Sequence, residues 1–156
     1  MDLTNQMPIA TKSSKVDISK ESSTAKIAKK FSNILKKGDI IFLYGEIGVG
    51  KTTFVRYLIN SFQKKNKQKL TEVTSPTFSI LNDYRIKGTT IKHYDLFRIK
   101  KMNETENIGL FENMNEFITI VEWPEKIKKK IKKRYDLFFK YNSNSKKRFI
   151  KIYKVN

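Results

Sequence analysis

The sequence predicts an α/β fold in which a mixed, largely parallel central sheet lies between flanking helices, in three layers. Two apolar runs, DIIFLY at 39–44 and FITIVEW at 117–123, are typical of strands that a parallel sheet buries on both faces. The glycine-rich segment GEIGVGKTT at 45–53 directly follows the first run, and apolar residues at helical spacing come next. A strand, a glycine-rich turn and a helix in this order begin an α/β unit.

Residues 15–156 are expected to form a single domain, because this is an ordinary domain length and no linker divides it. The preceding residues, 1–14, are polar and aperiodic, and we expect them to be flexible. The chain has no cysteine, which excludes disulfides and thiolate metal sites and is compatible with a cytoplasmic location. We find no signal-like segment and no apolar run of about 20 residues, so no membrane partner is expected.

The charge balance is strongly basic, with a formal net charge of +18. Such an excess favours association with polyanions such as nucleic acid, or with acidic partners. The chain is also rich in Lys, Asn and Ile, which A- and T-rich codons encode, so genome composition explains the same excess. Both explanations stay open at this point.

The first part of the domain is expected to hold an edge strand and two helices. KVDIS at 15–19 alternates like a short edge strand. The helix after it is expected to be capped by Ser22 or Ser23 and to end at Gly38. A second helix is expected over 52–63, directly after the glycine loop.

The second part is expected to hold two hairpins and further helices. Strand-like runs at 78–86 and 89–99 flank a Lys-Gly pair and predict a hairpin. Residues 101–116 are expected to form one or two short helices. The segment PEKIKKKIKKR at 124–134 has proline at its start, which predicts a basic helix. The runs YDLFFKY and RFIKIYKV predict a closing hairpin.

The glycine loop fits the phosphate-binding pattern G-x-x-x-x-G-K-[ST]. Its glycines permit backbone angles at which N–H groups converge on phosphate oxygens, and the following helix directs its positive end at them. We expect Lys51 to reach the outer phosphates and the Thr52 hydroxyl to bind Mg²⁺. The side chains of Glu46 and Ile47 are expected to face solvent or to pack. The loop residues expected at the nucleotide are Gly45, Ile47, Gly48, Val49, Gly50, Lys51, Thr52 and Thr53.

Two carboxylates follow strand-like runs and are candidates for a second contact to Mg²⁺. Glu122 ends FITIVE, and Asp95 ends TIKHYD. A carboxylate at the end of a neighbouring strand often takes this role, although either acid would also suit a strand end at the surface. The guanine-reading pattern Asn-Lys-x-Asp is met only by NKQK at 66–69, where lysine replaces the acid. Adenine is therefore expected by elimination, with ATP and Mg²⁺ as cofactors.

Three further segments accompany the loop: SPTFSI at 75–80, HYDLFR at 93–98 and VEWPE at 121–125. Together with GEIGVGKTT and the ESST at the first helix, this ordered set resembles the bacterial TsaE family, also called YjeE, over about residues 16–125. The resemblance implies a three-layer P-loop NTPase-like fold. It also implies a weak Mg²⁺-dependent ATPase in the formation of threonylcarbamoyladenosine in tRNA, stimulated by a TsaB–TsaD complex whose repeated turnover it supports.

The resemblance also implies roles for individual residues. Lys51 and Thr52 hold the phosphates and Mg²⁺, and Glu122 is the second magnesium-associated acid. Asp95 is the other functional acid and positions water or Mg²⁺. The expected catalytic residues are Lys51, Asp95 and Glu122, and the expected metal-associated residues are Thr52 and Glu122.

Other positions follow from the same resemblance. Ser75 and Thr77 are expected to be polar contacts in a nucleotide-sensitive loop, and Glu21 to approach the base or ribose through its backbone. Trp123 is expected near the nucleotide, near a partner surface, or in the core. Phe97 stands where the family commonly has Tyr, which keeps stacking but removes a hydroxyl.

The basic run at 126–134 exceeds what the resemblance requires. We expect tRNA as a partner either through the TsaB–TsaD complex or through this basic face, and an idle surface is the alternative. Two other function classes are a small-molecule kinase and a nucleic-acid-binding module with a vestigial phosphate loop. A kinase needs an arginine-bearing lid, and the arginines do not cluster as one. The retained loop lysine and acids argue against a vestigial loop.

Overall fold

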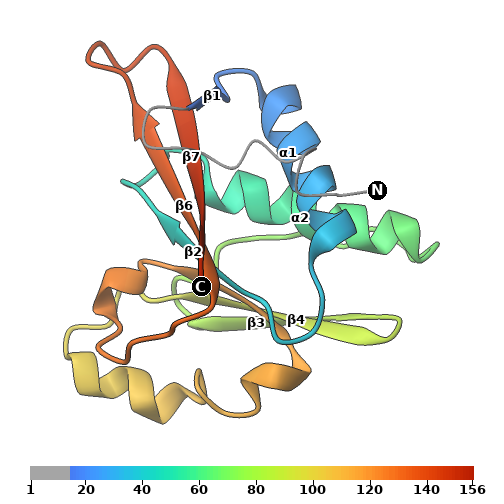
Figure 1. Ribbon diagram of the computed structural model, residues 1–156, viewed down its shortest axis with the longest axis vertical. Helices are drawn as coiled ribbons and strands as arrows, with labels where there is room; N and C mark the ends of the chain where they lie inside the picture. Colours follow the sequence, from blue (N-terminus) through green and yellow to red (C-terminus); the bar gives the residue numbers. More distant parts are fainter. Residues whose placement is uncertain (1–14) are drawn as a thin grey trace.

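A seven-stranded mixed sheet forms the centre of the structure, a computed structural model that describes residues 15–156 (Figure 1). The segment 1–14, which we expect to be flexible, lies outside the described residues. The strands are β1 (Val16–Asp17), β2 (Ile40–Tyr44), β3 (Leu81–Ile86), β4 (Thr89–Asp95), β5 (Ile118–Glu122), β6 (Arg134–Tyr141) and β7 (Arg148–Val155). The helices are α1 (Glu21–Ile34) and α2 (Lys51–Lys65), with 3-10 segments η2 (Met102–Ile108), η3 (Met114–Glu116) and η4 (Pro124–Lys126).

The strand order is β1-β7-β6-β2-β5-β4-β3. The four central strands β6, β2, β5 and β4 are parallel to one another, and the flanking strands β1, β7 and β3 pair antiparallel. The carboxyl ends of β2, β5 and β4 consequently meet at one edge of the sheet. In open α/β sheets, ligands bind in the crevice outside such strand ends.

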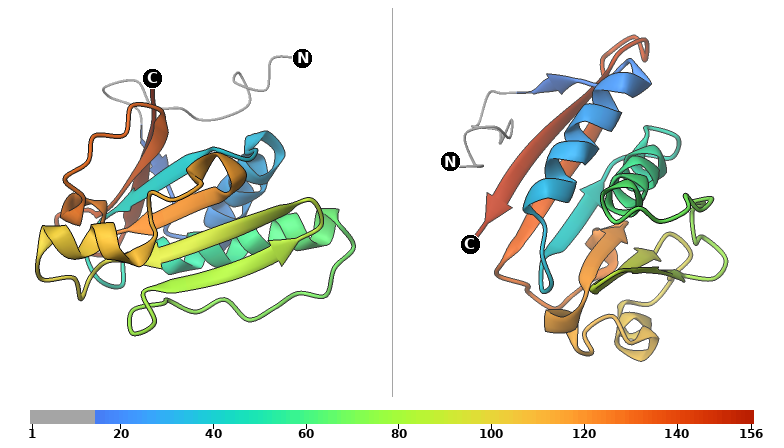
Figure 2. Two further views of the ribbon diagram at one scale, coloured as in Figure 1. Left: turned by 90° about the horizontal axis from the view of Figure 1, so that it is seen from below. Right: turned by 90° about the vertical axis from the view of Figure 1, so that its right-hand side faces the viewer.

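The sheet lies between two layers of unequal kind (Figure 2). Helices α1 and α2 cover one face, where Phe31 of α1 packs edge-on against Phe54 of α2, with ring centroids 5.7 Å apart. The other face carries a smaller apolar cluster that includes Tyr94, Leu96 and Leu110, under the chain around η2 and η3. The predicted three-layer α/β fold is confirmed.

Most predicted elements are found close to their expected places. The edge strand, the strand before the glycine loop, the helix after it and both hairpins are present. The short helices expected over 101–116 are the 3-10 segments η2 and η3. No helix among residues 15–156 is long and apolar enough to cross a membrane.

The prediction of a basic helix over 124–134 is wrong. The chain makes one 3-10 turn, η4, continues without regular structure, and enters β6 at Arg134. A helix here would place Lys128 above Lys132 and repeat like charges at four-residue spacing, which is unfavourable. Two isoleucines alone would anchor it, and helices in proteins depend on a packed apolar face. Ile127 and Ile131 instead pack against the smaller apolar cluster.

The predicted caps of α1 are also wrong in detail. The helix begins at Glu21, so Ser22 and Ser23 lie within its first turn, and Lys20 occupies the N-cap without a side-chain hydrogen bond. The helix ends at Ile34, before Gly38. Gly38, with φ +90°, instead belongs to the turn that leads into β2.

Candidate functional site

The glycine loop wraps the N-terminus of α2 at the carboxyl end of β2. Gly45 has a φ of +147°, and a Cβ at this position would lie 2.8 Å from the carbonyl oxygen of Phe139. Gly50, the N-cap of α2, is left-handed with φ +116°. Both backbone conformations therefore favour glycine. Gly45 also has no room for a side chain, because the loop lies directly against β6. Val49 anchors the loop as a fully buried side chain.

Lys51 begins α2 and is buried inside the loop. Its ammonium donates to the carbonyl oxygens of Gly45 and, at 3.2 Å, of Glu46. It also lies 4.0 Å from the centroid of a Trp123 ring. Burial lowers the pKa of Lys51, and nearby carboxylates, with Glu122 the foremost, oppose that shift. The ammonium is thus held in the loop by neutral carbonyl oxygens, which charged phosphate oxygens would replace.

Glu122 is the centre of a hydrogen-bonded group at the end of β5. Its Oε1 accepts from the Thr52 hydroxyl at 3.0 Å and from His93 Nε2 at 2.8 Å. The carboxylate is 2% exposed and the imidazole is fully buried. An ionised carboxylate only accepts hydrogen bonds, so a bond to it uses the Nε2–H tautomer of the imidazole. His93 thereby holds the carboxylate facing Thr52.

His93 is the functional position that sequence analysis missed. A single histidine in a chain without cysteine cannot build a histidine metal site, so its residue type alone indicates no function. The available signal was strand periodicity, since His93 and Asp95 are two residues apart in β4 and face the same side of the sheet. The contact itself joins β4 to β5, whose pairing register places His93 opposite Ile120 and Asp95 opposite Glu122.

Asp95 ends β4 and is held by a second group of donors. Its Oδ2 accepts from the hydroxyls of Ser75, at 2.6 Å, and Thr77, at 3.0 Å. Its Oδ1 accepts from the backbone N–H of Phe97 at 2.9 Å. These three hydrogen bonds fix the orientation of the carboxylate. The SPTF segment therefore touches the site through Asp95.

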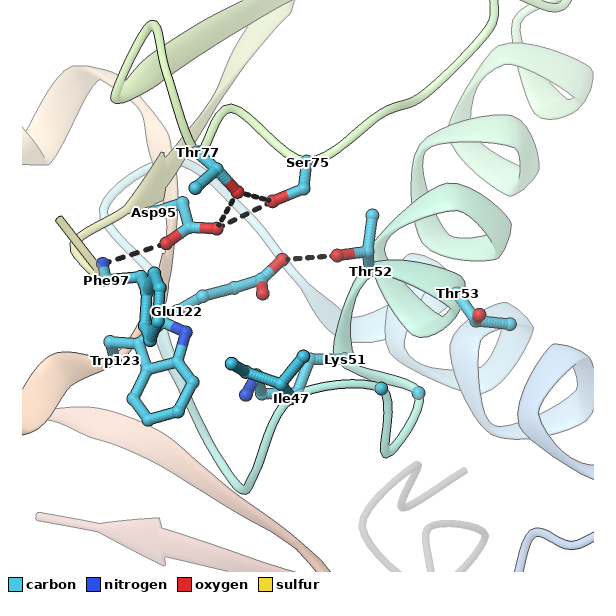
Figure 3. A pocket seen from close by; sticks show the side chains of 12 residues that line it. Ile47, Lys51, Thr52, Thr53, Ser75, Thr77, Asp95, Phe97, Glu122 and Trp123 are labelled. Atoms are coloured by element: carbon cyan, nitrogen blue, oxygen red, sulfur yellow. Dashed lines mark hydrogen bonds between the residues drawn. The ribbon is translucent and has the colours of Figure 1, made fainter.

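These groups surround one cavity of about 340 Å³ (Figure 3). Figure 3 shows the Thr52–Glu122 bond and the Asp95 group on one side of the cavity, with Lys51 and Ile47 below them. The Phe97 and Trp123 rings, with centroids 5.0 Å apart, form a wall. The lining residues are Ile47, Gly48, Gly50, Lys51, Thr52, Thr53, Ser75, Thr77, Asp95, Phe97, Glu122 and Trp123.

The remaining predicted site residues lie outside this lining. Gly45 and Val49 shape the loop from beneath. Glu21 lines a separate small cavity of about 40 Å³ on the other side of the loop, together with Thr53 and Arg148. The Glu21 carboxylate accepts from Arg56 and, at 2.8 Å, from the Tyr57 hydroxyl, so its side chain is engaged by α2.

The oxygen atoms and N–H groups at this cavity fit Mg²⁺ and a nucleoside triphosphate. Mg²⁺ prefers oxygen ligands, keeps several waters, and takes one or two protein groups besides the phosphates. The Thr52 hydroxyl and the Glu122 carboxylate are oxygen ligands 3.0 Å apart at the mouth of the loop. Backbone N–H groups at the start of α2 and the Lys51 ammonium suit phosphate oxygens.

A family model described as "Threonylcarbamoyl adenosine biosynthesis protein TsaE" matches residues 18–150. The chain belongs to the TsaE family. The match extends beyond the segment of resemblance and takes in β6 and the first strand residues of β7.

Curated TsaE proteins of several bacteria are similar to this chain. The TsaE protein of Rickettsia felis is 40% identical over 111 residues, which cover 71% of this chain and 63% of that protein. The match therefore spans less than two thirds of that relative's length. The Aquifex aeolicus protein is 36% identical, over 72% of this chain and 78% of its own. Each relative is named tRNA threonylcarbamoyladenosine biosynthesis protein TsaE.

A solved structure supports the fold of this TsaE-family chain. The crystal structure of Bacillus subtilis YdiB superposes with a TM-score of 0.68, covers 91% of this chain and 84% of its own, and is 23% identical. The predicted family and the α/β fold are thus confirmed.

Proposed function

We propose that residues 15–156 act as one P-loop ATPase domain in the cytoplasm, which binds ATP with Mg²⁺ and hydrolyses it slowly. The hydrolysis supports turnover of a TsaB–TsaD complex during formation of threonylcarbamoyladenosine in tRNA. One observation carries the proposal: Thr52, next to the buried Lys51, bonds to Glu122 at the end of the neighbouring strand. A phosphate-gripping loop and a carboxylate that share a hydroxyl are what a magnesium–triphosphate site needs.

The side chains divide the work of this proposed site. Lys51 and the N–H groups of the loop bind and orient the phosphates, and Thr52 with Glu122 holds the metal ion. When bound, Mg²⁺ neutralises charge that develops on the phosphate oxygens. His93 keeps Glu122 directed at Thr52 through its 2.8 Å hydrogen bond.

Asp95 is proposed to orient the attacking water. Three donors fix the carboxylate, at 2.6, 2.9 and 3.0 Å, within the same cavity. Ser75 and Thr77 are the donors that a nucleotide-dependent movement of the loop would add or remove. Their loss would leave Asp95 misdirected, which links the SPTF segment to the rate of hydrolysis. Slow intrinsic turnover with stimulation by a partner fits a site whose orientation depends on an exposed loop.

A kinase with a small-molecule acceptor is the rival function. Such an enzyme commonly stabilises the transferred phosphoryl group with arginine. Arg56 is paired with Glu21 outside the main cavity, and Arg98 lies 4.8 Å from the centroid of the Phe78 ring. Neither guanidinium is available at the phosphates in this arrangement, so we favour hydrolysis.

The deciding experiment measures ATP turnover by the purified chain, then with its cognate TsaB–TsaD complex, with and without Mg²⁺. We expect slow, metal-dependent phosphate release that the complex accelerates. Release that is unaffected by the complex would contradict the partnership. ATP consumed only with a small metabolite, and without free phosphate, would favour the kinase.

A further inference from the structure

The outward face of the β6–β7 hairpin alternates aromatic and basic side chains. In the pairing register, Phe138 lies opposite Lys151 and Lys140 lies opposite Phe149. Two residues further along β7, Tyr153 continues the row. The intervening residues, such as Leu137, Ile150 and Ile152, face the core on the other side of the sheet in the usual alternation of a strand.

Helices α1 and α2 lie on the opposite side of these strands (Figure 1). Among residues 15–156, the outward face is hollowed into a groove with a volume of about 780 Å³. Four lysines line it: Lys15, Lys140, Lys151 and Lys154. The one acid in the described lining, Asp136, is already paired with Arg134 through bonds of 2.8 and 3.0 Å. The groove therefore presents uncompensated positive charge.

The aromatic rings form a continuous row across three neighbouring strands. Tyr44 of β2 stacks on Phe138 of β6 with ring centroids 4.5 Å apart and an interplanar angle of 9°. Phe138 meets Tyr153 of β7 edge to face at 5.7 Å. Lys15 lies 4.3 Å from the centroid of Phe149, at the other end of the hairpin. Rings and ammonium groups are thus interleaved at the spacing of side chains on a sheet.

We propose that this platform, made of Tyr44, Phe138, Lys140, Phe149, Lys151 and Tyr153, binds a segment of single-stranded RNA. Bases stack on aromatic side chains, and a groove of lysines follows the phosphate backbone. An acidic protein segment would use the lysines but has no counterpart for the row of rings. The choice of RNA over DNA rests on the proposed function and on relatives named for tRNA threonylcarbamoyladenosine biosynthesis; the recognition of a base-bearing polyanion rests on the platform alone.

The site is separate from the cavity at the carboxyl ends of the strands. None of the platform residues lines that cavity. The run at 126–134 offers a comparison within the same chain, because it is equally basic but presents no row of rings. Its contacts with aromatic rings are separate ones: Lys129 lies 4.9 Å from the Phe111 ring centroid, and Arg134 lies 5.4 Å from that of Phe42. If RNA binds through charge alone, it should bind both surfaces. If bases also stack on aromatic rings, RNA should bind the platform more tightly than the basic run.

The test uses fluorescence anisotropy of the full chain with a labelled 12-nucleotide single-stranded RNA over a salt series. The variant K15Q/K140Q/K151Q removes three lysines from the groove, and K128Q/K129Q/K132Q removes three from the basic run. We expect the first variant to flatten the salt slope by about two, since each phosphate contact on a single strand contributes roughly 0.7. The second variant should keep nearly the wild-type slope. Equal losses in the two variants would overturn the proposal.

Ring replacement tests stacking separately. F149L and Y153L should each weaken RNA binding by about tenfold, because a base stacked on an aromatic ring depends strongly on that ring. F149Y and Y153F keep the rings and should bind like wild type, which controls for packing of the hairpin. Unchanged affinity in both leucine variants would overturn the platform even if the lysines matter.

Competitors identify the occupant. Heparin, which has charge but no bases, should compete without sensitivity to the ring variants. A DNA strand of the same sequence that binds as tightly as the RNA would overturn the choice of RNA. Dimerisation that the leucine variants abolish, with RNA binding unchanged, would identify a second copy as the occupant and overturn the proposal.

ATP turnover is followed in parallel, and since the platform lies outside the nucleotide cavity, the leucine variants should retain it. Failure of the ATPase proposal and failure of the RNA proposal are therefore distinguishable.

Discussion

Lys51 is the residue on which we expect nucleotide affinity to depend most directly. Its ammonium is held among carbonyl oxygens inside the loop, so a triphosphate replaces neutral acceptors with charged ones. The K51A variant should lose ATP affinity by about tenfold or more, because a charge-assisted hydrogen bond contributes roughly 1.5–3 kcal/mol. Calorimetric titration measures the loss. A folded variant with wild-type affinity and turnover would contradict the assignment.

Substitutions of Glu122 and Asp95 are expected to impair different steps. E122Q keeps the size of the side chain but removes the charge beside Thr52, so the concentration of Mg²⁺ needed for turnover should rise. D95N keeps an oxygen acceptor and should reduce hydrolysis more than ATP binding. Turnover measured across a Mg²⁺ series, with the partner complex present, separates the two. Full metal-dependent turnover in both variants would count against this site.

His93 is a positioning residue, and its removal should be felt through Glu122. H93L fills similar space but leaves Glu122 Oε1 without one of its two donors. We expect reduced turnover with ATP affinity retained, and a loss of stability of about 1–3 kcal/mol because a buried carboxylate loses a donor. H93Q, which offers an N–H donor, is the matched variant and should recover part of the turnover. Identical turnover in H93L and wild type would show that Glu122 needs no support.

At the scale of elements, the loop and β6 are fitted to each other at Gly45. G45A would bring a Cβ to 2.8 Å from the Phe139 carbonyl oxygen and 2.9 Å from a methyl group of Val49. We expect a loss of roughly 1–3 kcal/mol from overpacking, together with weaker ATP binding. G88A is the control, because Gly88 also has a positive φ, +83°, but nothing lies within 4 Å of the added Cβ.

Urea unfolding of the two glycine variants measures the difference. G88A should show only the cost of the left-handed backbone, about 1–2 kcal/mol, and should bind ATP normally. G45A should lose both stability and affinity. Equal unfolding curves with equal ATP binding would mean that the contact between the loop and β6 is not needed.

At the scale of the whole molecule, the sheet places its two proposed surfaces at different positions on neighbouring strands. The nucleotide cavity lies at the carboxyl ends of β2, β4 and β5, and the platform lies on the outward face of β6 and β7. One contact joins them: the Tyr141 hydroxyl, at the end of β6, donates to the carbonyl oxygen of Gly48 in the loop at 2.9 Å. Strand β2 also serves both, since Tyr44 directly precedes Gly45.

Much of the fold was predictable because its signals are local. Each of three signals lies within the segment that it predicts: the apolar run before the glycine loop, the motif of the loop itself, and the Lys87-Gly88 turn. The loop could be predicted in detail because phosphate binding needs particular residues at fixed spacing. The same holds for Glu122 and Asp95, which end buried strands and do line the cavity.

The rest depends on contacts between distant segments. The bond between His93 and Glu122 exists because β4 pairs with β5, and a single sequence does not state that pairing. The segment 124–134 was predicted as a helix because proline marks a helix start, but nothing local shows that its two isoleucines pack elsewhere. The platform became visible only when the register of β6 and β7 brought rings beside lysines.

The intrinsic fluorescence of Trp123 can report on the proposed nucleotide site. It is the one tryptophan of the chain, and its indole lies beside the Lys51 ammonium and the Phe97 ring. When phosphates draw the ammonium away from the indole, the emission of this single fluorophore should change without any added label. ATP titrations followed at tryptophan wavelengths would therefore report occupancy directly, and the signal should be absent in K51A. Because no second indole dilutes it, the same signal would follow nucleotide release in real time while the chain is bound to its partners.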